Sequence, residues 1–572
     1  MGIAQTPSFA LVGAPERGAD FLHFDYVNPN APKGGTLTQG SRVSFDTTNG
    51  MRFPGKMANE LDYIYDTLMV RAEDEPAAFY GLLAQDIEIA NNFSTLRFHL
   101  QPEARWHDGT PLTAHDVAFT FETVAEHGLP QYRTLLDGVG IRTLSDTELV
   151  FLAPDDSGWL LLEFISTFPI FQRSFWATRD VARMSLDVPI GSGPYRIARL
   201  DPNNQVVLER VPDYWGADLP VNRGRWNFDR IVTNYFKDAT IMVEAMRGGQ
   251  LDVNREYAAS SWHRRYDGPA LDEGRLLKST FKRPDGAAMI TLVFNLRRPP
   301  LDDLRVRTAL TALLDGVFVR TSFFGDLYTE PNAYYGGTRF EPVGEPSDAE
   351  KEVLQPFRER LPEGVFQSGA APLFDPLSKR ERLRLADDLL SDAGFTVADG
   401  VRVNAKTGEP LALEYVGANS SSRSMLLYYS EALAEAGIRL DVQYFDYVAG
   451  SRRILNHEWD LTSMGFATSF PPGQSERLYW HSEKAHEPGY ALAGATDAAI
   501  DATIEAMSRA ESEQELDAAA RAFSRVLSWQ RYMLPIAEND EVWIAHKPNV
   551  RFPKSFSVRG FHFISSLWID PV

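Results

Sequence analysis

The stretch 411–447, LALEYVGANSSSRSMLLYYSEALAEAGIRLDVQYFDY, decides the fold class. A strand pattern over Leu411–Val416 is followed by a helix pattern that ends before Gly437. A second strand, Ile438–Tyr444, then alternates apolar and polar residues, which indicates one buried face and one wet face. Strands that alternate with helices in this way are typical of α/β proteins. The sequence therefore predicts an α/β fold with several lobes.

Strand and helix signals of the same kind lie upstream. Asp238 is placed to cap a helix that buries Ile241, Ala245 and Met246 and ends at Gly248. A new alternation begins near 284 with a strand over 290–295. We expect a helix over 303–317 to follow it, with one apolar face made by Val306, Leu310, Leu313 and Val317.

Three further segments carry local predictions. Thr113 and Asp116 have the spacing of a capping box, so a helix should begin there. Apolar residues over Met57–Met69 recur at helical spacing, and Thr329–Asp375, rich in Pro and Gly, indicates a long surface excursion. Two acidic helices are expected at about 497–510 and 513–529.

Length and composition limit the possible functions. The 572 residues correspond to roughly three or four domains of about 150 residues. The formal charge of −21, without a basic tract, argues against nucleic acid as a partner. The absence of cysteine excludes thiol nucleophiles, disulfides and Cys-ligated metals, so no such chemistry needs to be sought.

The sequence offers no membrane-spanning segment. Its most apolar stretch, Trp159–Phe171, is interrupted by Glu163 and Pro169 and is shorter than the ~20 residues that a span needs. The N-terminus has no basic region followed by an apolar one. This leaves two alternatives, a cytosolic chain or a mature form whose signal peptide has been removed.

Motifs of catalysis and nucleotide binding are missing from the sequence. Gly191-Ser-Gly-Pro194 does not match the nucleophile elbow of hydrolases, and a close chain crossing that only glycine permits explains it better. Phosphate-binding glycine loops do not occur. We therefore predict no catalytic residues and no nucleotide cofactor.

Candidate metal ligands and paired acids have simpler explanations. His481 and His486, with Glu483 and Glu487, form the densest group, but their spacing matches no metal motif, and a solvated polar loop is favoured. The pairs Asp155-Asp156 and Asp302-Asp303 lie beside turns or helix starts, where carboxylates stabilise helix N-termini. No metal and no cofactor are expected.

Aromatic residues are abundant, with 11 Trp, 21 Tyr and 35 Phe. Most aromatic side chains fill cores, yet in a chain of several lobes without a catalytic motif an aromatic cleft is a natural binding site. The residues alone thus indicate a large binding protein, and they leave its ligand open.

Several segments of the sequence resemble one protein family. They are FDYVNPNAPKGGTL (24–37), WHDGTPLTAHDVAFTF (106–121), GSGPY (191–195), DYWG (213–216), LPVNRGRWNFD (219–229), FNL (294–296) and DLRVRTAL (303–310). By these segments the chain is similar to the extracellular solute-binding proteins of peptide/nickel ABC importers, family 5 (cluster C), and to their YejA branch.

The resemblance implies a bilobal, type II periplasmic-binding-protein fold with an extra inserted domain. Domain Ia would comprise 1–56, 187–282 and 535–572, and domain Ib would be the insertion 57–186. Domain II would be 283–534. The chain would cross between lobes near 283 and 534.

The resemblance also implies the ligand chemistry. An extended peptide would lie between the lobes and bond, like an added strand, to a main-chain edge. That edge would be Gly465, Phe466, Ala467 and Thr468. Ser469 stands where related receptors have an aspartate that holds the peptide α-ammonium, so Asp446 is the alternative acid. Asn419, Phe53 and Tyr132 are further ligand-binding candidates.

These expectations define one leading function and two alternatives. The leading function is a periplasmic, monomeric peptide receptor that serves an inner-membrane ABC permease and its ATPase subunits, without catalysis of its own. The first alternative is an oligosaccharide receptor of the same fold, with sugars stacked on aromatic rings. The second is a periplasmic hydrolase that uses paired carboxylates such as Asp155 or Asp302.

Overall fold

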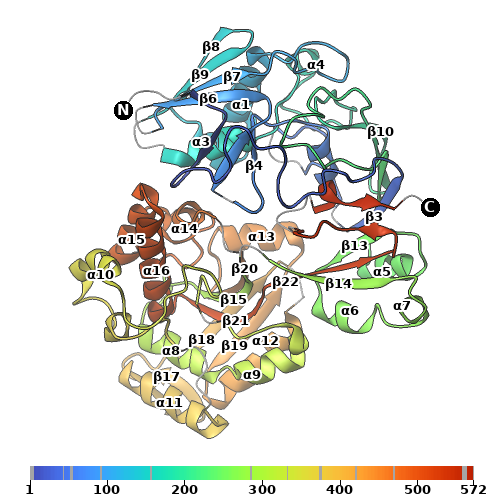
Figure 1. Cartoon of the computed structure of the whole chain (residues 1–572). Helices are drawn as coiled ribbons and strands as arrows, with labels where there is room; N and C mark the ends of the chain where they lie inside the picture. The colour runs from blue at the N-terminus through green and yellow to red at the C-terminus, as the bar shows by residue number, and fades with distance from the viewer. Residues whose placement is uncertain are drawn as a thin grey trace. The chain divides into compact units, whose positions relative to one another are not determined.

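The chain divides into two compact units, shown in a computed structural model (Figure 1). The structure describes residues 5–570 except 43, 52–55, 76, 91–92, 155–157, 284–285, 332, 373–376, 419–421, 468–469 and 557–562. Unit 1 comprises 1–284 and 542–572, and unit 2 comprises 285–541. The observed elements are α-helices and mixed sheets, so the predicted α/β class is confirmed.

Unit 1 contains a seven-stranded sheet that brings its first and last segments together. In sheet order its strands are β10 (Tyr195–Asp201), β11 (Gln205–Arg210), β12 (Arg230–Tyr235), β3 (Thr36–Ser41), β13 (Val253–Glu256), β22 (Glu541–His546) and β14 (Leu277–Lys282). Strand β3 is parallel to β12 and β13, and β22 returns antiparallel to β13. The short helices α5 (Ala239–Arg247), α6 (Ala259–Arg264) and α7 (Pro269–Asp272) belong to the same part (green in Figure 1).

The remainder of unit 1 is built on a second, five-stranded sheet. Its order is β1 (Gln5–Thr6), β6 (Ala84–Ala90), β7 (Thr95–Leu100), β9 (Glu148–Leu152) and β8 (Gly140–Ser145). A three-stranded sheet, β2 (Ser8–Ala10), β5 (Ala78–Gly81) and β4 (Met69–Arg71), and the two-stranded β23 (Val550–Arg551) and β24 (Trp568–Ile569) complete the strands. Its helices are α1 (Ala114–His127), α2 (Pro130–Leu135), α3 (Gly158–Thr167) and α4 (Arg173–Trp176).

One apolar cluster joins these parts of unit 1. It includes Leu37 of the seven-stranded sheet, Phe98 of the five-stranded sheet and Phe121 of α1, all without exposed surface. The limits of an inserted domain over 57–186 remain a prediction, because this core continues across them.

Unit 2 is organised around one mixed sheet of five strands. Its order is β19 (Arg439–Tyr444), β18 (Ala412–Gly417), β20 (Leu461–Ala467), β15 (Ala288–Phe294) and β21 (Met533–Asn539). Strand β18 is parallel to both β19 and β20, whereas β15 is antiparallel to β20 and β21. Since β21 belongs here, the second crossing between the units falls at 541/542 rather than at the expected 534.

The helices of unit 2 complete its core. They are α8 (Leu304–Leu313), α9 (Gly316–Val319), α10 (Asp348–Leu354), α11 (Lys379–Asp392), α12 (Arg423–Glu435), α13 (Tyr447–Leu455), α14 (Gln474–Trp480), α15 (Ala498–Arg509) and α16 (Glu513–Gln530). A hairpin of β16 (Phe395–Ala398) and β17 (Val401–Asn404), which the sequence analysis missed, lies between α11 and β18. The two acidic helices predicted near 497–510 and 513–529 are confirmed as α15 and α16.

Several capping predictions are confirmed. Thr113 and Asp116 form the capping box of α1, and Asp303 accepts the Arg305 N–H at the start of α8. Asp238 accepts the N–H groups of Thr240 and Ile241 at the start of α5. Short-range patterns thus predicted where these helices begin.

Four local predictions were wrong for tertiary reasons. Ile241 is 60% exposed because α5 turns Met242 and Val243 inward, and Val317 is 57% exposed because α8 ends at Leu313. The apolar residues of Met57–Met69 are buried, but they form a 3-10 turn over Asn59–Tyr63 and an extended segment that leads into β4 rather than one helix. The excursion 329–375 is likewise partly buried.

The excursion packs against α16 and carries a buried ion pair. Tyr335 and Phe340 have no exposed surface, and the Tyr335 ring lies 6.0 Å from that of Phe523 on α16. Glu350 of α10 accepts from Arg525 of α16 at 2.8 Å, with side-chain exposures of 4% and 0%. A buried carboxylate and guanidinium need each other, so this pair fixes α10 on α16.

Gly191-Ser-Gly is the close chain crossing predicted from the sequence. A Cβ at Gly191 would lie 1.9 Å from the Ile64 carbonyl oxygen, and one at Gly193 would lie 2.8 Å from the Ile64 carbonyl carbon. Ser192 Oγ accepts the N–H of Asp66. Residues 191–193 therefore pack directly against the backbone of residues 64–66.

Candidate functional site

The carboxyl ends of three parallel strands of unit 2 meet at one edge of its sheet. Strands β18, β19 and β20 run in the same direction. Asn419, Asp446 and the segment 465–469 follow or end these strands in the sequence. In open α/β sheets, ligands commonly bind at this edge. We therefore treat it as the candidate binding site of unit 2.

The hydrogen-bond pattern of β20 shows which peptide groups face β15. The Asn295 N–H donates to the Asp460 carbonyl at 3.0 Å, and the register continues without a bulge to Ala288↔Ala467. In an antiparallel pair, residues alternate between those that bond to the partner and those whose N–H and C=O point away. Gly465 and Ala467 therefore direct their peptide groups away from β15.

No described strand covers those groups on the opposite side. Strand β18 pairs with β20 at Tyr415↔Leu461, and it ends at Gly417. Within the described ranges, the sheet pairs Met464–Ala467 with β15 alone. Gly465 is exposed and has room around it, since an added Cβ would lie 3.9 Å from the nearest atom. This is a main-chain edge to which an extended chain can bond.

Buried aromatic rings hold that edge from behind. Phe466 is 6% exposed, and its ring lies 5.4 Å from both Tyr479 and Trp480 and 5.8 Å from Tyr334. The side chain of Phe466, a residue predicted to belong to the edge, thus packs against these rings. Its backbone bonds to β15 by the alternation given above.

Asp446 caps a helix at the same end of the sheet. Its carboxylate accepts the Ala449 N–H at 3.0 Å at the start of α13. That helix lies close to the end of β18, because a Cβ at Gly450 would be 2.6 Å from Ala418 Cα. Asp446 is exposed, so the cap leaves its carboxylate in contact with solvent. Its role as an ammonium acceptor stays a prediction.

The remaining predicted site residues are distributed as follows. Asn419, Thr468, Ser469 and Phe53 lie outside the described residues. Tyr132 belongs to α2 of unit 1, so the structure does not join it to the edge of β20 within one unit. The structure thus brings Asp446, Gly465, Phe466 and Ala467 to one end of one sheet.

Tyr132 lines a cavity of about 350 Å³ inside unit 1. Its ring stacks on Phe164 at 4.7 Å and meets Phe168 edge-on at 5.7 Å. Asp62 is the acidic residue of the lining, which also includes Asn49, Gly50, Met57, Leu129, Thr167, Pro169 and Phe171. Phe53 falls in the sequence between the lining residues Gly50 and Met57. The cavity combines aromatic faces with one carboxyl group.

The carboxyl group of Asp62 has an unusual proton affinity. Burial, assisted by the charge of Glu60, raises the pKa of Asp62 to about 7. Burial and the charge of Asp62 in turn raise the pKa of Tyr132 above its ordinary value. The sequence analysis missed Asp62, because it lies in a 3-10 turn without a motif. Phe164, Phe168 and Phe171, spaced four and three residues apart, were a signal for a shared aromatic surface.

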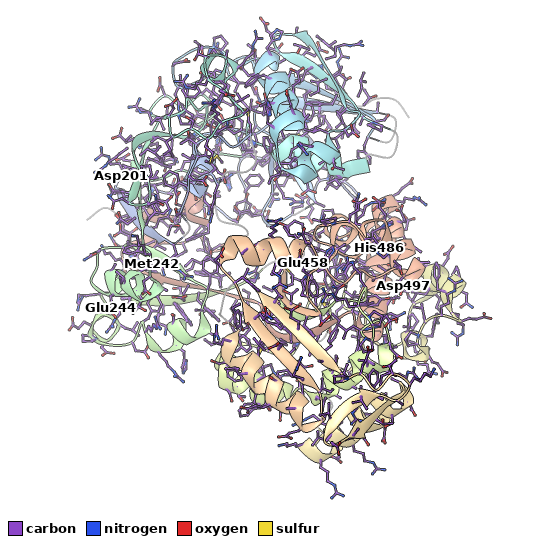
Figure 2. The ribbon with its side chains drawn as sticks, turned by 180° about the vertical axis from the view of Figure 1, so that it is seen from behind. Asp201, Met242, Glu244, Glu458, His486 and Asp497 are labelled. Atoms are coloured by element: carbon purple, nitrogen blue, oxygen red, sulfur yellow. The ribbon has the colours of Figure 1, made fainter. Side chains whose placement is uncertain are left out.

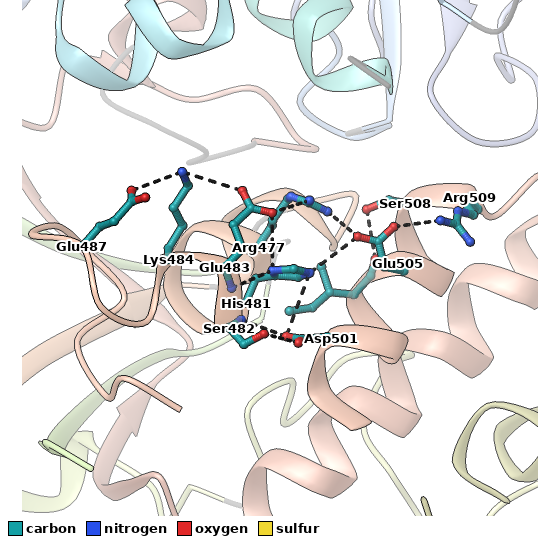
Figure 3. A network of polar contacts seen from close by, with 11 residues as sticks. Arg477, His481, Ser482, Glu483, Lys484, Glu487, Asp501, Glu505, Ser508 and Arg509 are labelled. Carbon is teal, nitrogen blue, oxygen red and sulfur yellow. Dashed lines mark hydrogen bonds and ion pairs between the residues drawn. The ribbon is translucent and has the colours of Figure 1, made fainter. Parts of the chain in front are cut away.

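The histidine and glutamate cluster near 481–487 is an ion-pair network (Figure 3). Arg477 lies between Glu505 at 2.5 Å and Glu483 at 2.8 Å, and His481 Nε2 is 3.5 Å from Glu505. His486, labelled in Figure 2, is exposed and lies outside that network. Among the described residues, no group of three or more acidic or histidine side chains is arranged to hold a metal ion. The Arg477 guanidinium lies between the Glu483 and Glu505 carboxylates, where a metal cation would have to bind.

Asp303, one of the paired acids, and His107, from the segment 106–121 that resembles the family, both make structural contacts. Asp303 pairs with Arg305, whose guanidinium holds the pKa of that carboxyl below its usual range. Asp155 and Asp156 lie outside the described residues. His107 Nε2 lies 2.9 Å from the Gly193 carbonyl and Asp108 accepts the Thr110 N–H, so this motif is a turn.

Solved structures share the fold of this chain. The fold matches the oligopeptide-binding protein AppA from Bacillus subtilis in complex with a nonapeptide, with a TM-score of 0.68 and 18% identity over 95% of this chain and 100% of that one. It also matches a periplasmic oligopeptide-binding protein of Thermotoga maritima bound to mannohexaose, with a TM-score of 0.69 and 18% identity over 93% and 96%. The bilobal solute-binding-protein fold expected from the resemblance is therefore confirmed.

Sequence comparisons give the family. The model of the bacterial extracellular solute-binding proteins, family 5 (middle part), matches residues 78–486. YejA of Escherichia coli is 33% identical over 99% of this chain and 93% of its own, and a probable peptide-binding YejA of Agrobacterium fabrum is 32% identical over 98% and 93%. The chain belongs to family 5 of the extracellular solute-binding proteins of ABC importers. The expected resemblance to the YejA branch is confirmed.

One general property accompanies this assignment. Within the described part of the chain, no helix is both long enough and apolar enough to cross a bilayer. The matching family model and the matching structure of AppA are both named for binding a substrate.

Proposed function

We propose that this protein is a periplasmic receptor that binds extended peptides and delivers them to an inner-membrane ABC permease with its ATPase subunits. The ligand would be held between the two lobes, and it would add as a strand to the edge of β20. A monomer suffices for this role. No catalytic step and no cofactor are part of the proposal.

One observation carries the proposal, the uncovered edge of β20. Gly465 and Ala467 direct their peptide groups away from β15, and no described strand pairs with them there. Hydrogen bonds to main-chain groups do not depend on the ligand's side chains, so this edge suits peptides of varied sequence. A receptor in complex with a nonapeptide shares the fold, which supports the same ligand class.

A second candidate ligand is an oligosaccharide. A mannohexaose-bound protein has the same fold, and the aromatic residues of unit 1 could stack on sugar rings. A sugar cannot use a strand edge with the regular spacing of a peptide, however. The edge of β20 therefore favours the peptide.

Isothermal titration can test the proposal with alanine peptides of three to six residues and with mannohexaose as the competing ligand. Gly465→Pro removes the outward N–H without breaking the ladder to β15, whereas Gly465→Ala keeps that N–H. Loss of this one bond, which leaves a carbonyl of the ligand unpaired, costs about 1–3 kcal/mol, or roughly 5- to 150-fold in affinity. We expect this loss for Gly465→Pro and less than a threefold change for Gly465→Ala.

Two further measurements complete the test. Thermal unfolding must show that Gly465→Pro keeps the wild-type fold, and Ala467→Pro provides a second variant that loses an outward N–H. Peptide binding unaffected by both proline variants would refute the proposed edge. Binding of mannohexaose without any peptide binding would refute the peptide function.

A further inference from the structure

We propose that the cavity of unit 1 binds an ammonium group of the ligand, with the ring cluster of Tyr132, Phe164 and Phe168 beside it and the Asp62 carboxylate as its counter-charge. The inference rests on the proposed peptide function and adds to it a preference for one kind of ligand group. It concerns a different unit from the strand edge, and it depends on side chains rather than on main chain.

The size and lining of the cavity favour a side chain or chain end with an apolar body. Its volume of about 350 Å³ lies at the lower end of ligand pockets, which range over roughly 300–1,000 Å³. Phe164, Phe168 and Phe171 contribute apolar surface, and Leu129 and Met57 extend it. A flexible aliphatic stem can pack against such surfaces.

The aromatic rings have an arrangement that suits a cation. Tyr132, Phe164 and Phe168 contact one another, with centroids 4.7, 5.0 and 5.7 Å apart. Their planes are inclined to one another by 30° to 77°, and all three residues line the cavity. The face of an aromatic ring attracts ammonium groups, more strongly where water is excluded.

The negative charge of Asp62 would let the cavity discriminate between a cationic and a neutral ligand group. It lines the same cavity as the three rings. Asn49, the amide of the lining, uses its Nδ2 on the Val181 carbonyl at 2.9 Å and its Oδ1 on the Met51 N–H at 3.1 Å. Glu60 accepts the Tyr235 hydroxyl at 2.7 Å, outside the lining. The acid that a cation would meet in the cavity is therefore Asp62.

The proton affinity of Asp62 agrees with this assignment. Its pKa of about 7 reflects burial and the charge of Glu60, both of which disfavour the ionised form. A cation placed beside the carboxylate would offset both effects. An anionic or neutral ligand group would not.

The ammonium can come from a lysine side chain or from the peptide's own N-terminus. Two series of pentaalanine peptides separate these sources. In the first, acetylated peptides carry lysine or norleucine at each of the five positions in turn. In the second, the norleucine peptides have a free or an acetylated N-terminus. Norleucine keeps the stem of lysine without its charge.

The variants are Asp62→Asn, Tyr132→Leu and the control Glu244→Gln. Glu244 lies on α5 of unit 1 (Figure 2), and its side chain is 59% exposed, so the control makes the same charge change at a residue that does not line the cavity. Tyr132→Leu removes one ring and leaves Asp62 in place. It keeps the test valid if Asp62→Asn does not fold.

We expect at least a 10-fold preference for lysine over norleucine at one position, or for the free over the acetylated N-terminus. Asp62→Asn should abolish that preference, Tyr132→Leu should reduce it two- to fivefold, and Glu244→Gln should keep it. Equal binding of cationic and neutral peptides by the wild type, or a preference that survives Asp62→Asn, would overturn the inference alone. Binding of none of these peptides would instead overturn the proposed peptide function.

Discussion

The edge of β20 and the cavity of unit 1 are built in opposite ways. At the edge, the peptide N–H and C=O of Gly465 and Ala467 point away from β15, while the aromatic side chain of Phe466 is buried behind them. In the cavity, aromatic side chains and the carboxyl of Asp62 form the lining. Main-chain groups are the same in every peptide, whereas rings and a charge discriminate between ligand groups. A receptor with both surfaces can accept many peptides and still prefer some.

The largest expected effect concerns the support behind the edge. Phe466→Ala removes a ring packed against Tyr334, Tyr479 and Trp480, and such truncations cost about 3–5 kcal/mol. Denaturant unfolding should show this loss in the transition of unit 2. Leu427→Ala is the matched control, because Leu427 is 53% exposed on α12 and should change stability by less than about 0.5 kcal/mol. Equal losses in both variants would contradict the role given to Phe466.

A smaller effect is expected from changes to the ligand's backbone. A peptide added to a strand edge directs every second N–H toward that edge. Methylation of those nitrogens should weaken binding by about 1.4–2.8 kcal/mol, or roughly 10- to 100-fold, and methylation of the intervening ones by less than threefold. Titration of pentaalanine peptides methylated at one position at a time provides the measurement. A loss that does not alternate along the peptide would show that recognition is not strand-like.

The smallest effect concerns the pH dependence of unit 1. The folded-state pKa of Asp62, about 7, lies above the ordinary value of 3.8, so its neutral form is favoured by folding. The stability that this group contributes is fully present below about pH 4 and is lost as pH rises through 7. Asp62→Asn should therefore gain stability relative to wild type as the pH rises from 4 to 8. Urea unfolding at pH 4, 6 and 8 checks this, and a difference independent of pH would contradict it.

Local signals in the sequence predicted much of the fold. The helix-capping residues Thr113, Asp238 and Asp303 lie within three residues of the N–H groups that they cap, so predicting these helix starts needed no tertiary information. The inward face of α5 was mispredicted at Ile241, because the choice between neighbouring apolar residues depends on what packs against the helix. Similarly, the segment 329–375 is partly buried only because α16, almost two hundred residues later, covers it.

The candidate site was harder to predict. The resemblance indicated the segment 465–468, but which peptide groups point outward follows from the Asn295–Asp460 bond, which sequence does not reveal. The cavity joins Asp62, Tyr132 and Phe164 from segments up to about one hundred residues apart, so no local pattern contains it. The local sequence signal for the cavity was the spacing of Phe164, Phe168 and Phe171.

The most direct test of the peptide function is the mass of the ligand that accompanies the purified protein. Protein purified without refolding would be denatured, and the released small molecules would be analysed by mass spectrometry. The proposed function predicts a series of short-peptide masses that fragment at peptide bonds. Masses spaced by hexose units, without peptides, would contradict it and identify the protein as an oligosaccharide receptor.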